Sequence, residues 1–168
     1  MPPISNYETT IKTTRLCLDP LLVSHAQDMF PILSDRELYS FTGDEPPESE
    51  ESLKTRYRLL ESRKSPDESE LWLNWLVSLE ENGTPIGYVQ ATVSDADATI
   101  AWLIGLKWQS NGYASEAATA LVKWLTENGV KAIRCCINPN HGASQRVAGN
   151  AGLNKSSLVE DGEEVWLL

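Results

Sequence analysis

A polar turn between an apolar strand and a helix is the part of this sequence best suited to bind an anionic group. The apolar run of residues 102–106 leads into polar residues 109–112, and apolar residues at helical spacing follow from Ala117. The first amides of a helix lack internal acceptors, and the helix dipole adds about half a positive charge there. Such an end binds phosphate without a basic side chain. Gly112 permits backbone angles that a β-carbon would hinder. The pattern indicates a phosphate site or, equally, a plain connection.

The glycines of this segment do not fit the two common nucleotide-binding motifs. Gly105 and Gly112 do not make the dinucleotide fingerprint, and no Gly-Lys-Ser/Thr follows as a nucleotide P-loop requires. Neither common nucleotide fold is therefore predicted.

The cysteines and histidines do not predict a metal site. Cys17, Cys135 and Cys136 lack the two-residue spacing of a zinc knuckle and are expected to be small buried residues of strands. His25 lies beside an apolar helical stripe and is expected to have no role in chemistry. His141 is a possible base at neutral pH or, alternatively, a solvated loop residue.

Composition and charge limit the classes of function. The 168 residues fit one domain with a substantial core, and 41% of them are hydrophobic. The net charge of -10 excludes a basic nucleic-acid surface and mildly favours a cationic acceptor. No apolar run approaches the ~20 residues of a membrane span, and the first residues do not resemble a signal peptide. We expect a cytoplasmic protein with no membrane or nucleic-acid partner.

The elements that position the turn are predicted to form one mixed α/β domain over residues 1–168, with residues 1–8 flexible. A first strand is expected over residues 9–18, and helical spacing indicates helices over 22–33 and 53–60. Alternation then predicts an antiparallel meander, and the pattern ends in alternating helices and strands. The expected later elements are strands 71–77, 85–93 and 99–106, helix 117–125, strand 130–137, helix 143–151, and strands 157–160 and 164–168. Residues 65–69 are expected to be flexible.

Tryptophans on the predicted strands have two possible roles. Trp72, Trp75 and Trp102 either pack in the core or wall a cavity for an acceptor, because only one face of a strand need be core. An aromatic wall would attract an ammonium group or the apolar part of a ligand.

The turn resembles motif A of the GNAT superfamily of N-acetyltransferases, Gln/Arg-x-x-Gly-x-Gly/Ala, and matches it at Gln109, Gly112 and Ala114. Residues 112–117 are similar to the RimJ/RimL-like (ribosomal-protein acetyltransferase) branch. Further matches follow in chain order: residues 14–18 resemble the opening strand of that branch, residues 85–88 its "xIGx" strand, and residues 140–153 its "Asn-x-Ala-Ser-x-x-Val … Gly-Phe" ending. The resemblance covers about residues 9 to 168.

The resemblance implies a GNAT fold: a mostly antiparallel sheet with flanking helices, in which the parallel strands 99–106 and 130–137 splay apart to admit acetyl-CoA. It also implies the groups that bind this donor substrate. Backbone groups of Ile104 and Leu106 would hold the pantetheine arm, and amides from Gln109 to Ala114 would hold the pyrophosphate. The implied set is Ile104, Gly105, Leu106, Gln109, Ser110, Asn111, Gly112, Tyr113, Ala114, His141, Ser144 and Arg146. Asn111, His141 and Leu153 depart from the Lys or Arg, Asn and Phe of the branch.

Acetyl transfer to an amine requires loss of the amine proton, a donor for the oxyanion, and a proton for the departing thiolate. The resemblance places Ser144 near the thiol, where it would supply that proton; alternatively it caps its helix. Arg146 would pair with an acidic surface or a cofactor phosphate. No carboxylate stands out as the base, and Asp95, Asp97, Glu45 and Glu80 are equally well explained as solvated turn residues.

The sequence therefore predicts an acetyl-CoA-dependent N-acetyltransferase that acts by direct attack in a ternary complex. The acceptor would be a primary amine, either a protein N-terminus or a small molecule. The alternative is a non-catalytic acyl-CoA-binding or interaction module on the same fold. A homodimer through the C-terminal hairpin or an apolar edge strand is also possible.

Overall fold

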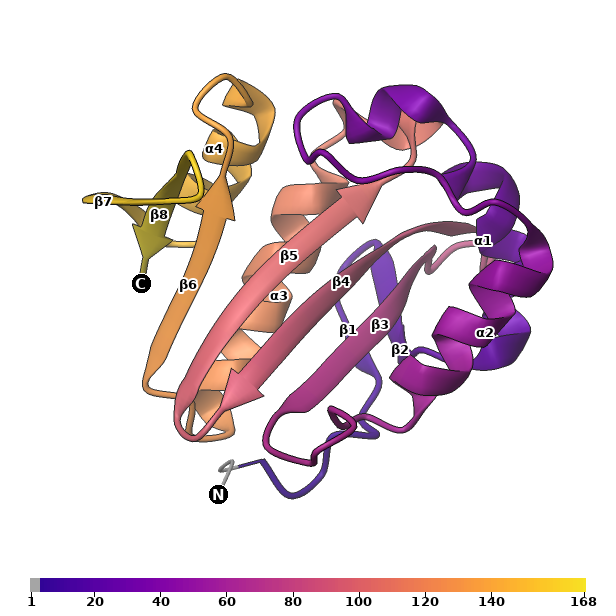
Figure 1. The fold of residues 1–168 in the computed structure, drawn as a ribbon, viewed down its shortest axis with the longest axis horizontal. Helices are drawn as coiled ribbons and strands as arrows, with labels where there is room; N and C mark the ends of the chain where they lie inside the picture. The colour runs from indigo at the N-terminus through magenta and orange to yellow at the C-terminus, as the bar shows by residue number, and fades with distance from the viewer. Residues whose placement is uncertain (1–3) are drawn as a thin grey trace.

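The computed structural model describes residues 4–168, which form a single eight-stranded sheet in the order β1-β2-β3-β4-β5-β6-β8-β7 (Figure 1). Every neighbouring pair of strands is antiparallel except β5 and β6, which are parallel. The predicted mixed α/β fold with a mostly antiparallel sheet is confirmed. The strands are β1 (Ile11–Lys12), β2 (Leu16–Pro20), β3 (Leu71–Leu79), β4 (Pro85–Ser94), β5 (Asp97–Ile104), β6 (Ala132–Ile137), β7 (Asn154–Glu160) and β8 (Glu163–Leu167).

Helices cover both faces of the sheet because successive strand residues point to opposite sides. On β3, Trp75 packs in the core with Leu121 and Leu125, whereas its neighbour Leu76 packs with Leu53 in a second core. Helix α3 (Tyr113–Glu127) covers the first face; α1 (Ala26–Leu33) and α2 (Glu50–Glu61) cover the second. Helix α4 (Gly142–Asn150) packs against α3 and β6. None of the helices in residues 4–168 has the length and apolar character needed to cross a bilayer.

Several predicted boundaries differ from those in the structure. The first predicted strand is divided into β1 and β2 by a tight turn, in which the Thr13 amide donates to the Leu16 carbonyl over 2.9 Å. Residues 106–108 form a 3₁₀ turn instead of extending β5, and α3 begins at Tyr113 instead of Ala117. The final hairpin is longer than predicted because β7 begins at Asn154, whose exposed polar side chain gives no apolar alternation.

The segment that was predicted to be flexible, residues 65–69, is a hydrogen-bonded turn. The carboxylate of Asp67 accepts hydrogen bonds from the hydroxyls of Ser65 and Ser69 and from the Ser69 amide. These hydrogen bonds lower the pKa of Asp67 to about 2. Ser65 is buried, so the turn packs against the body of the protein.

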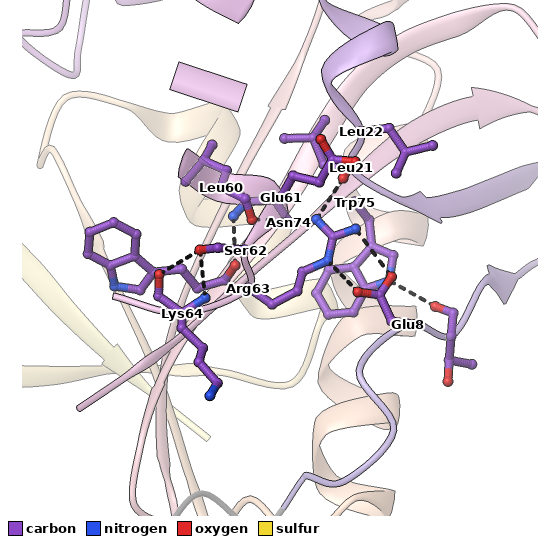
Figure 2. A network of polar contacts seen from close by, with 12 residues as sticks. Glu8, Leu21, Leu22, Leu60, Glu61, Ser62, Arg63, Lys64, Asn74 and Trp75 are labelled. Atoms are coloured by element: carbon purple, nitrogen blue, oxygen red, sulfur yellow. Dashed lines mark hydrogen bonds and ion pairs between the residues drawn. The ribbon is translucent and has the colours of Figure 1, made fainter. Parts of the chain in front are cut away.

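A buried arginine after α2 ties the N-terminal segment to the sheet (Figure 2). The side chain of Arg63 is 2% exposed and forms an ion pair with Glu8, 3.1 Å from Nε to Oε1. Its Nη1 donates to the Leu21 carbonyl over 2.6 Å. Of the residues that were predicted to be flexible, 1–3 lie outside the described part of the chain, whereas Ile4 is buried and Glu8 forms this ion pair. A charge buried this deeply requires such partners.

Candidate active site

The parallel strands β5 and β6 pair over only three residues and then separate (Figure 1). Their paired residues run from Asp97–Ala132 to Thr99–Arg134, after which β6 remains paired with β8 alone. The amide of Gly105 donates to the Ile86 carbonyl of β4 over 2.8 Å. Because amide direction alternates along a strand, the N–H groups of Trp102 and Ile104 point towards the gap. Within residues 4–168 these two amides have no hydrogen-bond partner, and such strand amides can bind an extended ligand.

A cleft of about 490 Å³ occupies the space between these strands. It is lined by β5, the turn before α3, the end of β6, and α4, with the loop of residues 37–42 along its mouth. The cleft residues from the predicted set are Ile104, Leu106, Gln109, Ser110, Gly112, Tyr113, Ala114, His141, Ser144 and Arg146. Gly105 and Asn111 belong to the same turn but do not line the cleft.

The turn before α3 presents unoccupied amides to the cleft. Ser110 has φ 63° and Gly112 has φ 80°, so the backbone enters the left-handed region twice within three residues. Gly112 is the N-cap, and no side chain in the described residues caps the helix. The first helical amides, from Tyr113 to Ser115, therefore remain available to an anion. The turn therefore has the backbone geometry that the predicted phosphate site requires, and the site itself stays a prediction.

Arg15, in the tight turn between β1 and β2, contacts the turn before α3. Its Nη1 donates to the Asn111 carbonyl over 3.0 Å, and its Nε donates to Glu116 over 2.7 Å. The guanidinium also lies 4.5 Å from the centre of the Tyr113 ring. Burial raises the pKa of the Glu116 carboxyl, but hydrogen bonds from Thr13 and Arg15 outweigh it and hold that pKa below its ordinary value. Sequence reasoning missed this role, since Arg15 is about a hundred residues away from the turn.

Two amide side chains of the turn bond to its own backbone. Gln109 Nε2 donates to the Ile104 carbonyl over 2.9 Å, which uses one of the two lone pairs of that oxygen. Asn111 Nδ2 donates to the carbonyls of Trp108 and Gln109. Asn111 thus stabilises the turn, where the resembling branch has a basic residue.

The opposite wall of the cleft carries Ser144 and His141. Ser144 Oγ lies 3.4 Å from His141 Nε2. His141 is the N-cap of α4 without a side-chain cap bond, and Ser144 is the third helical residue, so the described structure does not support a capping role for Ser144. Burial lowers the pKa of His141, which keeps the imidazole neutral at pH 7. Arg146 also lines the cleft, and within residues 4–168 it has no acidic partner within ion-pair distance.

Phe41 also lines the cleft and contacts His141. Sequence reasoning did not identify this residue as part of the site. Its ring stacks on His141 with centroids 4.5 Å apart and planes 14° apart. Phe41 comes from the loop between α1 and α2, whereas His141 precedes α4, and no local pattern links segments so far apart. The stack joins the two sides of the cleft at its mouth.

The three tryptophans predicted for an acceptor wall do not lie together. Trp102 lines the cleft. Trp75 is 1% exposed, packs edge-on against Trp124 and donates its indole N–H to the Thr9 carbonyl, so its prediction as a cavity wall is wrong. Trp72 points to the opposite face of β3 and donates to Glu70. Trp72 and Trp75 point to opposite faces of the sheet because they are three residues apart on one strand.

The carboxylates considered as bases are not in the cleft. Glu80 pairs with Lys12, and Glu45 pairs with Arg36 on the far side of the loop. Asp95 and Asp97 lie at the closed end of β5 and do not line the cleft. The carboxylates that do line it are Glu37 and Glu163. Glu37 lies in a short 3₁₀ helix and Glu163 in the final hairpin, and no sequence pattern at either position predicts a place in the site.

The cysteines of β6 lie at the cleft, but their chemistry is limited. Burial raises the pKa of the Cys135 thiol to about 12, so it is protonated and a poor nucleophile at neutral pH. Among the described residues, no group of three or more His, Cys, Asp or Glu side chains could hold a metal ion.

Comparisons with known proteins agree with this architecture. A family model described as "Acetyltransferase (GNAT) domain" matches residues 15–154. The fold is similar to a GNAT-family acetyltransferase from Bacillus anthracis, with a TM-score of 0.78 and 19% identity over 95% of this chain and 98% of that one. It is also similar to a Vibrio cholerae protein assigned as a ribosomal-protein-serine acetyltransferase, with a TM-score of 0.72 and 19% identity over 100% and 99% of the two chains.

A third similar structure is AAC(6')-Ib in complex with ribostamycin and coenzyme A, with a TM-score of 0.74 and 19% identity over 90% of this chain and 91% of that one. Comparison with curated protein sequences finds no match. The splayed strands and the amide-lined turn define an acyltransferase of the type that takes its acyl group from a thioester of coenzyme A. This chain belongs to the GNAT acetyltransferase family.

Proposed function

We propose that this acetyltransferase transfers the acetyl group of acetyl-CoA to a primary amine, by direct attack of the amine in a ternary complex. The observation that carries the proposal is the cleft between β5 and β6, which runs from free strand amides to the uncapped N-terminus of α3. An extended chain that ends in a pyrophosphate has the chemistry this cleft requires.

Each part of the donor has a group suited to it. The amides at the start of α3 would bind the pyrophosphate, and Arg146 would supply a positive charge that no carboxylate in the described structure already neutralises. The amides of Trp102 and Ile104 would bind the pantetheine arm as a neighbouring strand would. One such amide would also stabilise the oxyanion that forms when the amine attacks.

Ser144 and His141 would complete the transfer. The amine nitrogen forms a bond to the acetyl carbon, the carbon–sulfur bond breaks, and the coenzyme leaves as a thiolate that needs a proton. The neutral ring of His141 would accept the proton that the amine loses, and it would pass a proton to Ser144, whose oxygen lies 3.4 Å from its Nε2. The Ser144 hydroxyl would in turn donate its own proton to the thiolate, so the proton lost by the amine balances the proton gained by the thiol.

The acceptor amine is either a protein N-terminus or a small molecule. The resemblance to the RimJ/RimL-like branch and the similar fold of the Vibrio cholerae protein favour a protein N-terminus. The similar fold of the ribostamycin complex favours a small-molecule amine. The second cavity described below favours a small molecule.

Release of free coenzyme A thiol, measured with enzyme, acetyl-CoA and a panel of amines, tests the proposed function. We expect thiol release only when all three components are present. Independently, CoA at about a hundred times its Kd should stabilise the folded state by about 2.7 kcal/mol, seen as a rise in Tm. No change in Tm at high CoA would refute donor binding. Binding without turnover on any amine would instead favour the non-catalytic acyl-CoA-binding module.

A further inference from the structure

A second cavity of about 290 Å³ lies on the face of the sheet that α1 and α2 cover. Its floor is formed by β3 and β4, and its walls by α2 and the loop that precedes it. The polar residues that line it include Asp44, Arg56, Tyr57, Asn74, Tyr88 and Gln90. The face lies opposite the core around α3, so this cavity is separate from the cleft between β5 and β6.

Buried polar groups at the floor of this cavity have unused hydrogen-bonding capacity. Tyr57 is 4% exposed, and its hydroxyl has no hydrogen-bond partner within residues 4–168. That hydroxyl is not among the fully enclosed unpaired atoms of the described residues, so it is open to the cavity. Tyr88 and Gln90 are half-buried, and the Tyr88 hydroxyl and the Gln90 side-chain amide likewise have no partner in the described chain. Asn74 is buried and uses only its Nδ2. Buried polar groups normally have partners; a ligand would supply them here.

The rim of the cavity carries charges that the described structure leaves unpaired. Arg56 forms no ion pair within residues 4–168, although its helix neighbours Lys54 and Arg58 pair with glutamates. Its guanidinium lies close enough to Tyr39, Tyr57 and Tyr88 to lower the pKa of each, although burial has the larger effect and raises all three.

Asp44 lies on the same rim, and its carboxylate has no partner in the described residues, whereas Glu45 is paired with Arg36. Arg56 can therefore bind the carboxylate of a ligand, and Asp44 can attract its ammonium group as the ligand enters the cavity. A zwitterion carries both of these charges.

The register of the sheet connects this cavity to the cleft. Asn74 of β3 is paired with Gln90 of β4, and Gln90 with Ala101 of β5. Paired residues point to the same face, and adjacent strands lie about 4.8 Å apart. Asn74 and Gln90 line the second cavity, whereas Ala101 lines the cleft. An acceptor that rests on Asn74 and Gln90 thus places one end about 5 Å from the strand that borders the thioester site.

We propose that the second cavity is the acceptor subsite and that it takes a small zwitterionic amine, in which a carboxylate several bonds from the reacting nitrogen binds Arg56. This inference rests on the proposed function, because it names the acceptor class of the same transfer. The product would be the N-acetylated amino acid and free coenzyme A, with the same bonds formed and broken as for any primary amine. A cationic diamine is disfavoured because its second ammonium group would face Arg56.

The test compares three acceptors of equal length: 6-aminohexanoate, hexylamine and 1,6-diaminohexane. We expect the enzyme to have at least about a tenfold higher kcat/KM for 6-aminohexanoate than for the other two, the usual size of a charge-assisted hydrogen bond. Arg56→Gln should remove this preference. Arg58→Gln, two residues further along the same helix and paired with Glu51, should retain it. Equal effects of the two variants, or a preference for hexylamine or the diamine, would overturn the proposal.

Calorimetry separates failure of this proposal from failure of the proposed function. With CoA present, 6-aminohexanoate should bind the wild type and should bind Tyr88→Phe and Arg56→Gln more weakly. If no amine is acetylated, the proposed function fails, and binding that depends on Arg56 still supports the subsite. If amines are acetylated but 6-aminohexanoate binding does not depend on Arg56, only the subsite is refuted.

Discussion

Ser144 and His141 are the residues in the cleft whose geometry most directly suggests proton transfer. The 3.4 Å between Ser144 Oγ and His141 Nε2 is close to hydrogen-bond distance, and the stacked Phe41 ring fixes the plane of the imidazole. A serine hydroxyl is a weak acid, so it protonates a thiolate efficiently only when a neighbour returns the proton. The imidazole of His141 becomes such a neighbour once it has accepted the proton that the attacking amine loses.

Replacement of Ser144 by alanine should therefore lower kcat by about 100-fold, at the lower end of the range for general acid catalysis. The KM for acetyl-CoA should change little, because the amides of the turn remain. Steady-state kinetics of thiol release measures both quantities. Ser144→Thr should restore much of the activity, and Ser24→Ala, at an exposed serine that lines neither cavity, is the matched control. An unchanged kcat in Ser144→Ala would show that the serine has no acid role.

The residues that sequence reasoning found and missed differ in how far apart they lie along the chain. The turn was predictable because its residues Gln109, Ser110 and Gly112 lie within four positions of the chain. Arg15 and Phe41 each act on a partner about a hundred residues away. Such contacts depend on how the strands are ordered in the sheet, and a single sequence does not show that order.

At the scale of the elements, the turn before α3 depends on its glycine. Gly112 has φ 80° and ψ 6°, and a β-carbon there would also lie 3.4 Å from the Arg15 guanidinium. Left-handed backbone costs roughly 1–2 kcal/mol for a residue with a β-carbon. The turn places the helix amides at the cleft, so relaxation of this strain should also displace those amides.

Gly112→Ala should accordingly lower the free energy of unfolding by about 1 kcal/mol and weaken CoA binding. Urea denaturation and a CoA titration give the two values. Gly149→Ala is the matched control, because Gly149 lies in α4 with open space where its β-carbon would be. That variant should be as stable as the wild type or more stable, since alanine favours a helix over glycine by up to about 1 kcal/mol. Equal loss of stability in both variants would contradict this account of the turn.

The meander of β3, β4 and β5 was predictable because its alternation is local, whereas the splay of β5 from β6 was not. The run from Ile100 to Ile104 is apolar throughout, and the run from Ile133 to Ile137 is interrupted only by Arg134. Neither pattern by itself indicates the residue at which the pairing of the two strands ends. Resemblance to the family implied the splay, and the structure locates it after Thr99 and Arg134. The prediction of an aromatic acceptor wall was wrong for Trp75 for a similar reason. The sequence does not show that both faces of β3 pack against a core.

At the scale of the whole molecule, the free edges of the sheet bear on assembly. Strand β7 is an edge strand, and its Leu158 and Val159 are 53% and 66% exposed. Edge strands with apolar side chains favour pairing with another chain. The homodimer expected from the sequence stays a prediction.

The stability of the whole molecule should fall as the pH decreases below about 6.5. Its only histidines are His25 and His141, and burial lowers the pKa of both below the ordinary 6.5. As the pH falls through 6.5, the unfolded chain binds protons at these rings before the folded protein does, so the free energy of unfolding decreases. The decrease continues until the pH reaches the lowered pKa values of the folded state.

Urea denaturation from pH 7.5 to pH 5 measures this slope. The double variant His25→Gln, His141→Gln should flatten it in the window just below pH 6.5. The losses from Glu116 and Asp67, whose pKa values are lowered in the folded state, belong to a lower window that begins near the unfolded pKa of about 4. An unaltered slope in the double variant would show that the histidines do not control stability in this range.

The two parts of the sheet are joined by only a short parallel pairing, between Asp97–Thr99 and Ala132–Arg134. The angle between β5 and β6 at this joint sets the width of the cleft between them. Ile137 is three residues beyond the joint, a lever arm of about 10 Å at 3.3 Å per residue. A rotation of only about 6° at the joint moves that end by about 1 Å, a displacement that can change a rate about 100-fold. The alignment of the two reacting partners thus depends on an angle fixed about 10 Å away, by paired residues outside the lining of the cleft.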